Sequence, residues 1–227
     1  MSAFSRNAEK DRIARDAYLD LAAAADQFEQ YPHPHAIRIA AIADRIAEAF
    51  HMAPQDRKSL RIAARMHDLG EVAMERDYIK RAGSLTDEER VDMQRHPVIG
   101  EQEAARASAA RDVQLLVRWH HEWWNGSGYP DALRQEEIPL AARILRAADS
   151  YAALTDARPF RRALSEADAR AQILQLAGIE FDPAVVSVLL AVRDLDEMRS
   201  FGHAEVNFET APPAVDENRD LFASFMK

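Results

Sequence analysis

The feature that most restricts the fold of this chain is a helical spacing of apolar residues that recurs through most of its length. In the segment 35–51, for example, Ile39, Ile42 and Ile46 stand three or four positions apart among charged neighbours. That spacing places them on one face of an α-helix. Only 7 Gly and 10 Pro occur among the 227 residues, which is few for the frequent turns of an all-β fold. We therefore predict an all-α protein.

Local signals predict where the helices begin and end. Thr86 and Glu89 form a capping-box pattern, which predicts a helix that continues to His96. Gly70 is expected to end the helix that begins at Pro54, because glycine is common just after the last helical residue. Further helices are predicted at about residues 8–30, 35–51, 112–121 and 139–154, and after the capping residues Ser165 and Asp182. We expect a helical segment at 1–30, a main domain at 31–200 and a tail at 201–227.

Charge and composition exclude several classes of protein. The formal net charge of −9 argues against binding of bulk nucleic acid, which needs a basic surface. The chain has no cysteine, so neither disulfides nor thiolate metal sites can form. No apolar run approaches the roughly 20 residues that span a bilayer, and the first residues lack the apolar core of a signal peptide. We expect a cytoplasmic protein that does not enter the membrane.

Histidines and two aspartates gather near predicted helix ends. Five of the 8 His lie there or beside Pro and Gly, as do the two aspartates: His35, His67, Asp68, His96, His120, His121 and Asp149. Imidazole and carboxylate ligands suit Fe, Mn, Zn or Ni, and helical bundles build dinuclear sites from ligands on several helices. Simpler interpretations remain open for each one, namely a hydrogen-bonded histidine at a helix end, a His–Asp pair or a capped, buried carboxylate.

Nine short motifs follow one another between residues 35 and 183. They are HAIRI (35–39), HDLG (67–70), GSLT (83–86), HPVIG (96–100), HHEWWNGSGYP (120–130), IPLAARI (138–144), AD (148–149), RPFR (158–161) and FDP (181–183). Each motif alone is weak, but together and in this order they are specific. On these residues the chain resembles the HD-GYP family, a branch of the HD-domain metal-dependent phosphohydrolases.

The resemblance implies an HD-domain helical bundle with extra N- and C-terminal helical segments. It further implies a phosphodiesterase that hydrolyses cyclic di-GMP and holds two divalent metals, Fe or Mn. The implied metal ligands are His35, His67, Asp68, His96, His120, His121 and Asp149, with Asp68 bridging both metals as the central catalytic residue. The same likeness implies that Tyr129, Arg158 and Arg161 contact phosphate or guanine, and that Glu71 lies beside the phosphate.

Four positions depart from the family pattern. Glu71 stands where members usually carry a lysine, so an anion replaces a cation near the phosphate. Tyr31 and Ala152 stand where members with a third metal have carboxylates, so we expect no third metal. Asn125 replaces an aspartate in the loop before Gly126 and keeps a residue that favours turns.

These departures leave three hypotheses about function. The first is a cyclic di-GMP phosphodiesterase of low activity. The second is a metal phosphohydrolase that acts on another phosphoester or nucleotide, because Glu71 alters the pocket. The third is a catalytically poor cyclic di-GMP receptor or interaction module. The residues leave the oligomeric state open, a homodimer included.

Overall fold

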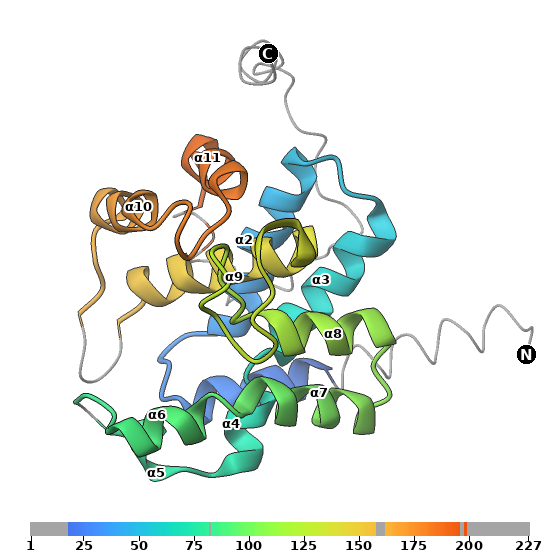
Figure 1. Cartoon of the computed structure of the whole chain (residues 1–227), viewed down its shortest axis with the longest axis vertical. Helices are drawn as coiled ribbons and strands as arrows, with labels where there is room; N and C mark the ends of the chain where they lie inside the picture. Colours follow the sequence, from blue (N-terminus) through green and yellow to red (C-terminus); the bar gives the residue numbers. More distant parts are fainter. Residues whose placement is uncertain (1–17, 82, 158–161, 196–197, 199–227) are drawn as a thin grey trace, which may run out of the picture.

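The computed structural model describes residues 18–81, 83–157, 162–195 and 198 (Figure 1). Within these ranges the ordered elements are helices, and β structure is limited to one isolated bridge between Ala177 and Phe181. The prediction of an all-α protein is confirmed. No helix in the described ranges is both long enough and apolar enough to cross a membrane.

Helices follow one another along the described chain, joined by short connections. Residues 18–28 are helical, and the labelled helices are α2 (His35–Ala49), α3 (Pro54–Met66), α4 (Leu69–Met74), α5 (Asp77–Lys80), α6 (Asp87–Met93), α7 (His96–Arg106), α8 (Arg111–Trp119), α9 (Leu140–Thr155), α10 (Glu166–Gln175) and α11 (Pro183–Ala191). One 3-10 turn, η1 (Gln135–Glu137), precedes α9. The predicted tail at 201–227 lies outside the described residues.

The core is centred on α9, which Figure 1 shows in yellow with α2, α3 and α8 beside it. Ile39, Ile42 and Ile46 of α2 are fully buried, as the spacing of apolar residues predicted. Tyr151 is the largest fully buried side chain among the described residues. Burial of each large apolar side chain contributes about 1.5–3 kcal/mol to the stability of the fold. The buried face of α2 therefore holds this helix firmly against α9.

Most of the predicted helix starts are confirmed. The Thr86 side chain accepts from the Glu89 backbone N–H at 3.2 Å, and the Glu89 carboxylate accepts from the Thr86 N–H at 2.9 Å. Ser165 and Asp182 also cap the helices that follow them. The prediction that the helix after Thr86 continues to His96 is wrong, because α6 ends at Met93 and His96 begins α7.

Gly70 does not end a helix as predicted but lies inside α4. Helix α3 ends at Met66. A Cβ atom at Gly70 would lie 1.9 Å from the carbonyl oxygen of His96 and 2.8 Å from the backbone nitrogen of Gly100. This glycine is therefore required because the backbones of α4 and α7 touch there. The close contact brings the Asp68 end of α4 next to the His96 end of α7.

Candidate metal centre

The seven residues predicted as metal ligands converge on one side of α9. His35 and His96 are the first residues of α2 and α7, and His67 caps the end of α3. Asp68 precedes α4, the His120–His121 pair follows α8, and Asp149 projects from α9. Six of the seven thus stand at helix ends, where a side chain can turn inward without interrupting a helix. Their role as ligands stays a prediction.

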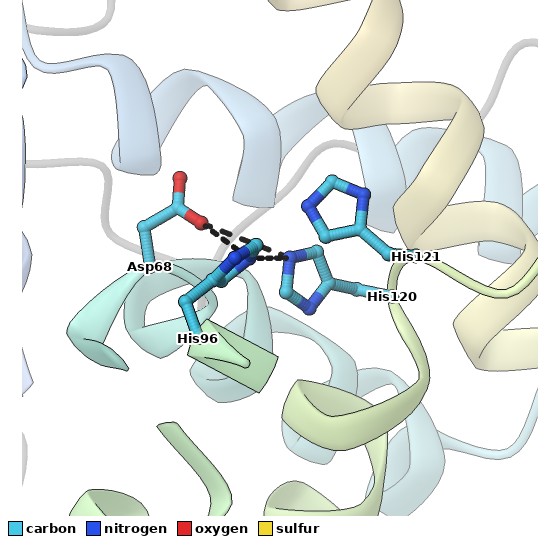
Figure 2. Close-up of side chains that lie close together, drawn as sticks. All are labelled: Asp68, His96, His120 and His121. Carbon is cyan, nitrogen blue, oxygen red and sulfur yellow. Dashed lines mark hydrogen bonds and ion pairs between the residues drawn. The ribbon is translucent and has the colours of Figure 1, made fainter. Parts of the chain in front are cut away.

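Asp68 lies at the centre of the set. Its Oδ2 is 2.7 Å from His67 Nε2, and its Oδ1 is 3.5 Å from His96 Nε2 and 3.7 Å from His120 Nε2. Figure 2 shows Asp68, His96, His120 and His121 facing one another, and each offers a ligand atom within 4.8 Å of the others. This arrangement could hold one cation.

A second group adjoins the first through Asp68. The Nε2 atoms of His35 and His67 lie 3.9 and 3.8 Å from Asp149 Oδ1. Because His67 Nε2 is also beside Asp68 Oδ2, the Asp68 carboxylate stands between the two groups with one oxygen toward each. The predicted bridging position of Asp68 is compatible with this geometry.

Backbone carbonyls fix the tautomers of three histidines. The Nδ1 atoms of His67, His96 and His120 lie 3.0, 2.7 and 2.7 Å from carbonyl oxygens three residues earlier in the chain. A carbonyl only accepts, so each Nδ1 carries the proton and donates it, and each Nε2 of a neutral ring keeps a lone pair directed at the cluster. Metal-binding histidines are commonly oriented by such a bond.

The lone pairs need a cation between them. His96 Nε2 and His120 Nε2 are 3.3 Å apart, a distance at which two lone pairs repel unless they share a proton or a metal. His67 Nε2 is buried and makes no hydrogen bond with any described residue, although Asp68 Oδ2 lies 2.7 Å away. The donor set therefore fits divalent metal ions, and imidazole with carboxylate suits Fe, Mn, Zn or Ni.

Burial and charge set the protonation of the cluster. Burial lowers the pKa of His96 to about 4, so this ring is neutral at pH 7. Burial also lowers the pKa of His67, but the charges of Asp68 and Asp149 outweigh it and raise the value to about 10. Burial raises the pKa of Asp68, whereas His67 and His120 hold it well below its ordinary value. The negative surroundings of His67 Nε2 favour a positive charge there, which a metal ion can supply.

Sequence reasoning missed the residues that support His35. Its Nδ1 lies 2.8 Å from Asp156 Oδ2, and the other oxygen of Asp156 accepts from Arg38 at 2.5 Å. Arg38 also donates to Thr155 Oγ1 at 2.8 Å. Asp156 follows Asp149 by seven residues, two helical turns, so the spacing could have drawn attention to it.

His121 differs from the other histidines because its Nδ1 accepts from Arg146 at 3.0 Å. Arg146 was also missed, although it precedes Asp149 by one turn of α9. The Tyr129 ring stacks on His121 at a centroid distance of 4.9 Å, and the Tyr129 N–H donates to the His121 carbonyl. Gly128 permits this approach, because a Cβ there would lie 2.2 Å from the Trp123 backbone nitrogen. Tyr129 thus borders the cluster, as its predicted role requires.

The positions that depart from the family pattern can also be located. Tyr31 stacks on His35 at a centroid distance of 3.6 Å, and Ala152 is fully buried. Glu71 is buried, and it offers a ligand atom within 4.8 Å of Asp68 and of Glu29, a residue that sequence reasoning missed. Arg158 and Arg161 lie outside the described residues.

Two surface hollows lie beside the helix at residues 18–28. One is lined by residues that include Phe28, Val72 and Lys80, and the other by residues that include Tyr31 and Ile37. Neither contains any of the seven predicted ligands. The chemistry of the side chains, and not the size of a hollow, identifies the candidate site.

Comparison with known proteins agrees with the geometry. A cyclic di-GMP phosphodiesterase of Vibrio cholerae is 35% identical over 202 residues, which cover 81% of this chain and 40% of that protein. The cyclic di-GMP phosphodiesterase response regulator RpfG of Xanthomonas campestris is 38% identical over 159 residues, 69% of this chain and 42% of that protein. The chain therefore spans less than half the length of these relatives.

A solved structure shares the fold. It is that of a cyclic GMP-AMP specific phosphodiesterase of V. cholerae, with a TM-score of 0.65 and 21% identity, covering 83% of this chain and 50% of the other. The sequence model of the HD domain matches residues 19–185. These residues include all seven that converge around Asp68, and the chain belongs to the HD-domain family.

Proposed function

We propose that this protein is a metal-dependent phosphodiesterase that hydrolyses cyclic di-GMP with low activity. The observation that carries the proposal is the convergence of the Nε2 atoms of His67, His96 and His120 on the Asp68 carboxylate, with each opposite nitrogen bound to a carbonyl. The neutral His96 ring has no Nε2 proton to donate to Asp68, so its position there suits a metal ligand better than a hydrogen-bond donor. The relatedness to cyclic di-GMP phosphodiesterases supports the choice of substrate.

Two divalent cations, Fe or Mn, would be held by the two groups that share Asp68. One group is His35, His67 and Asp149, and the other is His96, His120 and His121. Bound divalent metals supply Lewis acidity at the phosphoryl oxygens and activate water for attack on phosphorus. The chain keeps the ligands in place through the carbonyl bonds to the histidines and through Asp156, which holds the His35 ring.

Tyr129 would contact the substrate beside His121. Burial raises the pKa of its phenol well above the ordinary value, so the hydroxyl stays protonated at neutral pH and can donate to a phosphoryl oxygen. Arg158 and Arg161 are proposed, by resemblance alone, to bind phosphate or guanine.

Glu71 supports the proposal of low activity. Its carboxylate lies near those of Asp68 and Glu29, so negative charge accumulates where members of the family usually carry a lysine. A single cation that stabilises transition-state charge commonly contributes about 10²–10³ in rate. Glu71 provides no such contribution and opposes an anionic substrate. The same observation favours two alternatives, a different phosphoester as substrate or a receptor that binds cyclic di-GMP with little turnover.

One experiment separates these functions. Protein purified without oxygen is analysed for metal content, and the same sample is assayed with cyclic di-GMP, with 3'3'-cyclic GMP-AMP and with bis(4-nitrophenyl) phosphate. Slow, metal-dependent opening of cyclic di-GMP supports the proposal. Faster turnover of another ester would show that this ester, and not cyclic di-GMP, is the better substrate. Binding of cyclic di-GMP without hydrolysis by metal-loaded protein would identify a receptor.

A further inference from the structure

We propose that Arg146 is a substrate-binding residue that binds a phosphoryl oxygen next to His121 and Asp149. This inference rests on the proposed phosphodiesterase function. Neither the motifs nor the predicted ligands include Arg146, and its role follows from its position in the cluster. It would supply, from α9, a positive charge that Glu71 does not supply from α4.

The contacts of Arg146 place its guanidinium at the edge of the metal centre. Its Nη1 donates to His121 Nδ1 at 3.0 Å and lies 3.5 Å from Asp149 Oδ2. Its Nη2 donates to Glu180, in the turn before α11. The side chain is 14% exposed, so it is held by its neighbours but still reaches the surface. A guanidinium in this position touches two residues of the cluster directly.

Arg143, one turn earlier on the same helix, shows what a purely structural arginine looks like here. Its Nε donates to the Ile138 carbonyl at 2.8 Å, and its Nη1 donates to Asp182 at 2.5 Å. By contrast, the Nε of Arg146 is buried and makes no hydrogen bond with any described residue. Because this Nε is itself buried, only the two Nη atoms of Arg146, which face His121, Asp149 and Glu180, could meet a phosphoryl oxygen.

Tyr129 and Arg146 both contact His121. The Tyr129 ring stacks on the His121 ring, and Arg146 donates to His121 Nδ1. The two side chains therefore flank the same histidine, beside the place that the proposed function assigns to the substrate. Arginine also has the planar donor fork that matches two oxygens of a phosphate.

Metal binding would release a donor of Arg146. A neutral ring that accepts at Nδ1 carries its proton on Nε2, as His121 does beside Arg146. If His121 held a metal, its Nδ1 would carry the ring proton and would no longer accept from Arg146. The Nη1 of Arg146 would lose this acceptor and turn to an oxygen of the bound phosphate.

The test compares phosphate binding in metal-loaded, full-length variants by titration calorimetry with inorganic phosphate. Arg146→Gln should weaken phosphate binding by about tenfold to hundredfold while metal content stays unchanged. Glu180→Gln should tighten phosphate binding, because it removes the anion that partly neutralises the guanidinium. Arg143→Gln, the matched control, should lower the melting temperature without changing phosphate affinity.

Two results would overturn the proposal. Native phosphate affinity in Arg146→Gln would show that the guanidinium does not bind phosphate. Weakened phosphate binding in Glu180→Gln would show that the Arg146–Glu180 ion pair only supports the structure of the site. If Arg146→Gln does not fold, Arg146→Lys with partly retained affinity and Glu180→Gln with increased affinity still support it. If native protein did not hydrolyse cyclic di-GMP, the proposed function would be refuted. The difference in phosphate affinity between the Arg146, Glu180 and Arg143 variants would still test the role of Arg146.

Discussion

Replacement of Gly70 by alanine tests whether the contact between α4 and α7 assembles the metal centre. The added Cβ would meet three backbone atoms, at 1.9 and 2.7 Å from the carbonyl oxygen and carbon of His96 and 2.8 Å from the nitrogen of Gly100. Backbone cannot rotate away as a side chain can, so α7 must shift. Overpacking in a core typically costs about 1–3 kcal/mol, and we expect Gly70→Ala to reach or exceed the upper value.

The shift should also disturb metal binding. His96 begins α7 and its Nε2 lies 3.5 Å from Asp68 Oδ1, so movement of the helix separates these two predicted ligands. For a domain of about 150–250 residues each kcal/mol lowers the melting temperature by about 2–4 °C, which gives a loss of about 6–12 °C. Urea unfolding of metal-free protein and metal analysis after loading would measure the two effects separately.

A control distinguishes this contact from a general effect of adding a methyl group. Gly83 has a positive φ of 110°, and a Cβ there would have no atom within 4 Å. Gly83→Ala should therefore cost about 1–2 kcal/mol from backbone strain alone and leave metal content unchanged. If Gly70→Ala were as stable as native protein and bound its full metal complement, the reasoning about helix contact would be refuted.

Further predictions concern the charged groups. Asp68→Ala should empty or disorder both metal positions because its two oxygens face both groups, whereas Asp149→Ala should affect mainly one, as metal analysis or anomalous scattering would reveal. Metal-loaded protein should hold two metal ions per chain. About three ions per chain in native protein would contradict this. If the number then fell to two in Glu29→Gln, the third ion would be assigned to the carboxylates of Glu29, Asp68 and Glu71. Glu71→Lys should increase cyclic di-GMP turnover, by up to about 10²–10³, at constant metal content; an unchanged rate would show that this position does not limit the reaction. Burial raises the pKa of Asp26 from 3.8 to about 6, so the stability that the protonated carboxyl contributes below pH 4 is lost as the pH rises through 6. Urea unfolding at pH 4 and pH 7 would measure this loss as the difference between the two free energies of unfolding, and Asp26→Asn should reduce the difference by about 2 kcal/mol. An equal difference in native protein and in the variant would show that Asp26 does not cause the loss.

Local chemistry made much of the fold predictable from the sequence. Capping by Thr86, Ser165 and Asp182 depends on residues within three positions of each helix start, so a single stretch of sequence contains the whole interaction. The face of α2 that carries Ile39 and Ile42 likewise follows from spacing alone. Gly70 was misinterpreted because a glycine can end a helix or permit two backbones to touch, and only the position of His96 distinguishes the two.

The supporting residues of the candidate site were not predictable in the same way. Asp156 contacts His35 across 121 positions of sequence, and Arg146 contacts His121 across 25. Acidic and basic residues are frequent in this chain, with 38 Asp and Glu and 29 Lys and Arg, so no local pattern distinguishes these two from surface charges. Packing of α2 and α8 against α9 selects them.

Charge balance explains why α9 matters as much as the histidine motifs. Asp68, Asp149 and Glu71 bring negative charge to one buried place, and two divalent cations would compensate most of it. A phosphodiester adds further negative charge, which Glu71 cannot balance in the way that a lysine at its position could. Arg146 borders the same cluster from α9, where its guanidinium pairs with Glu180. If Arg146 binds the substrate as proposed, the site keeps a cation for the phosphate but takes it from a different helix, and its affinity for phosphate would depend on how firmly Glu180 retains the Arg146 guanidinium.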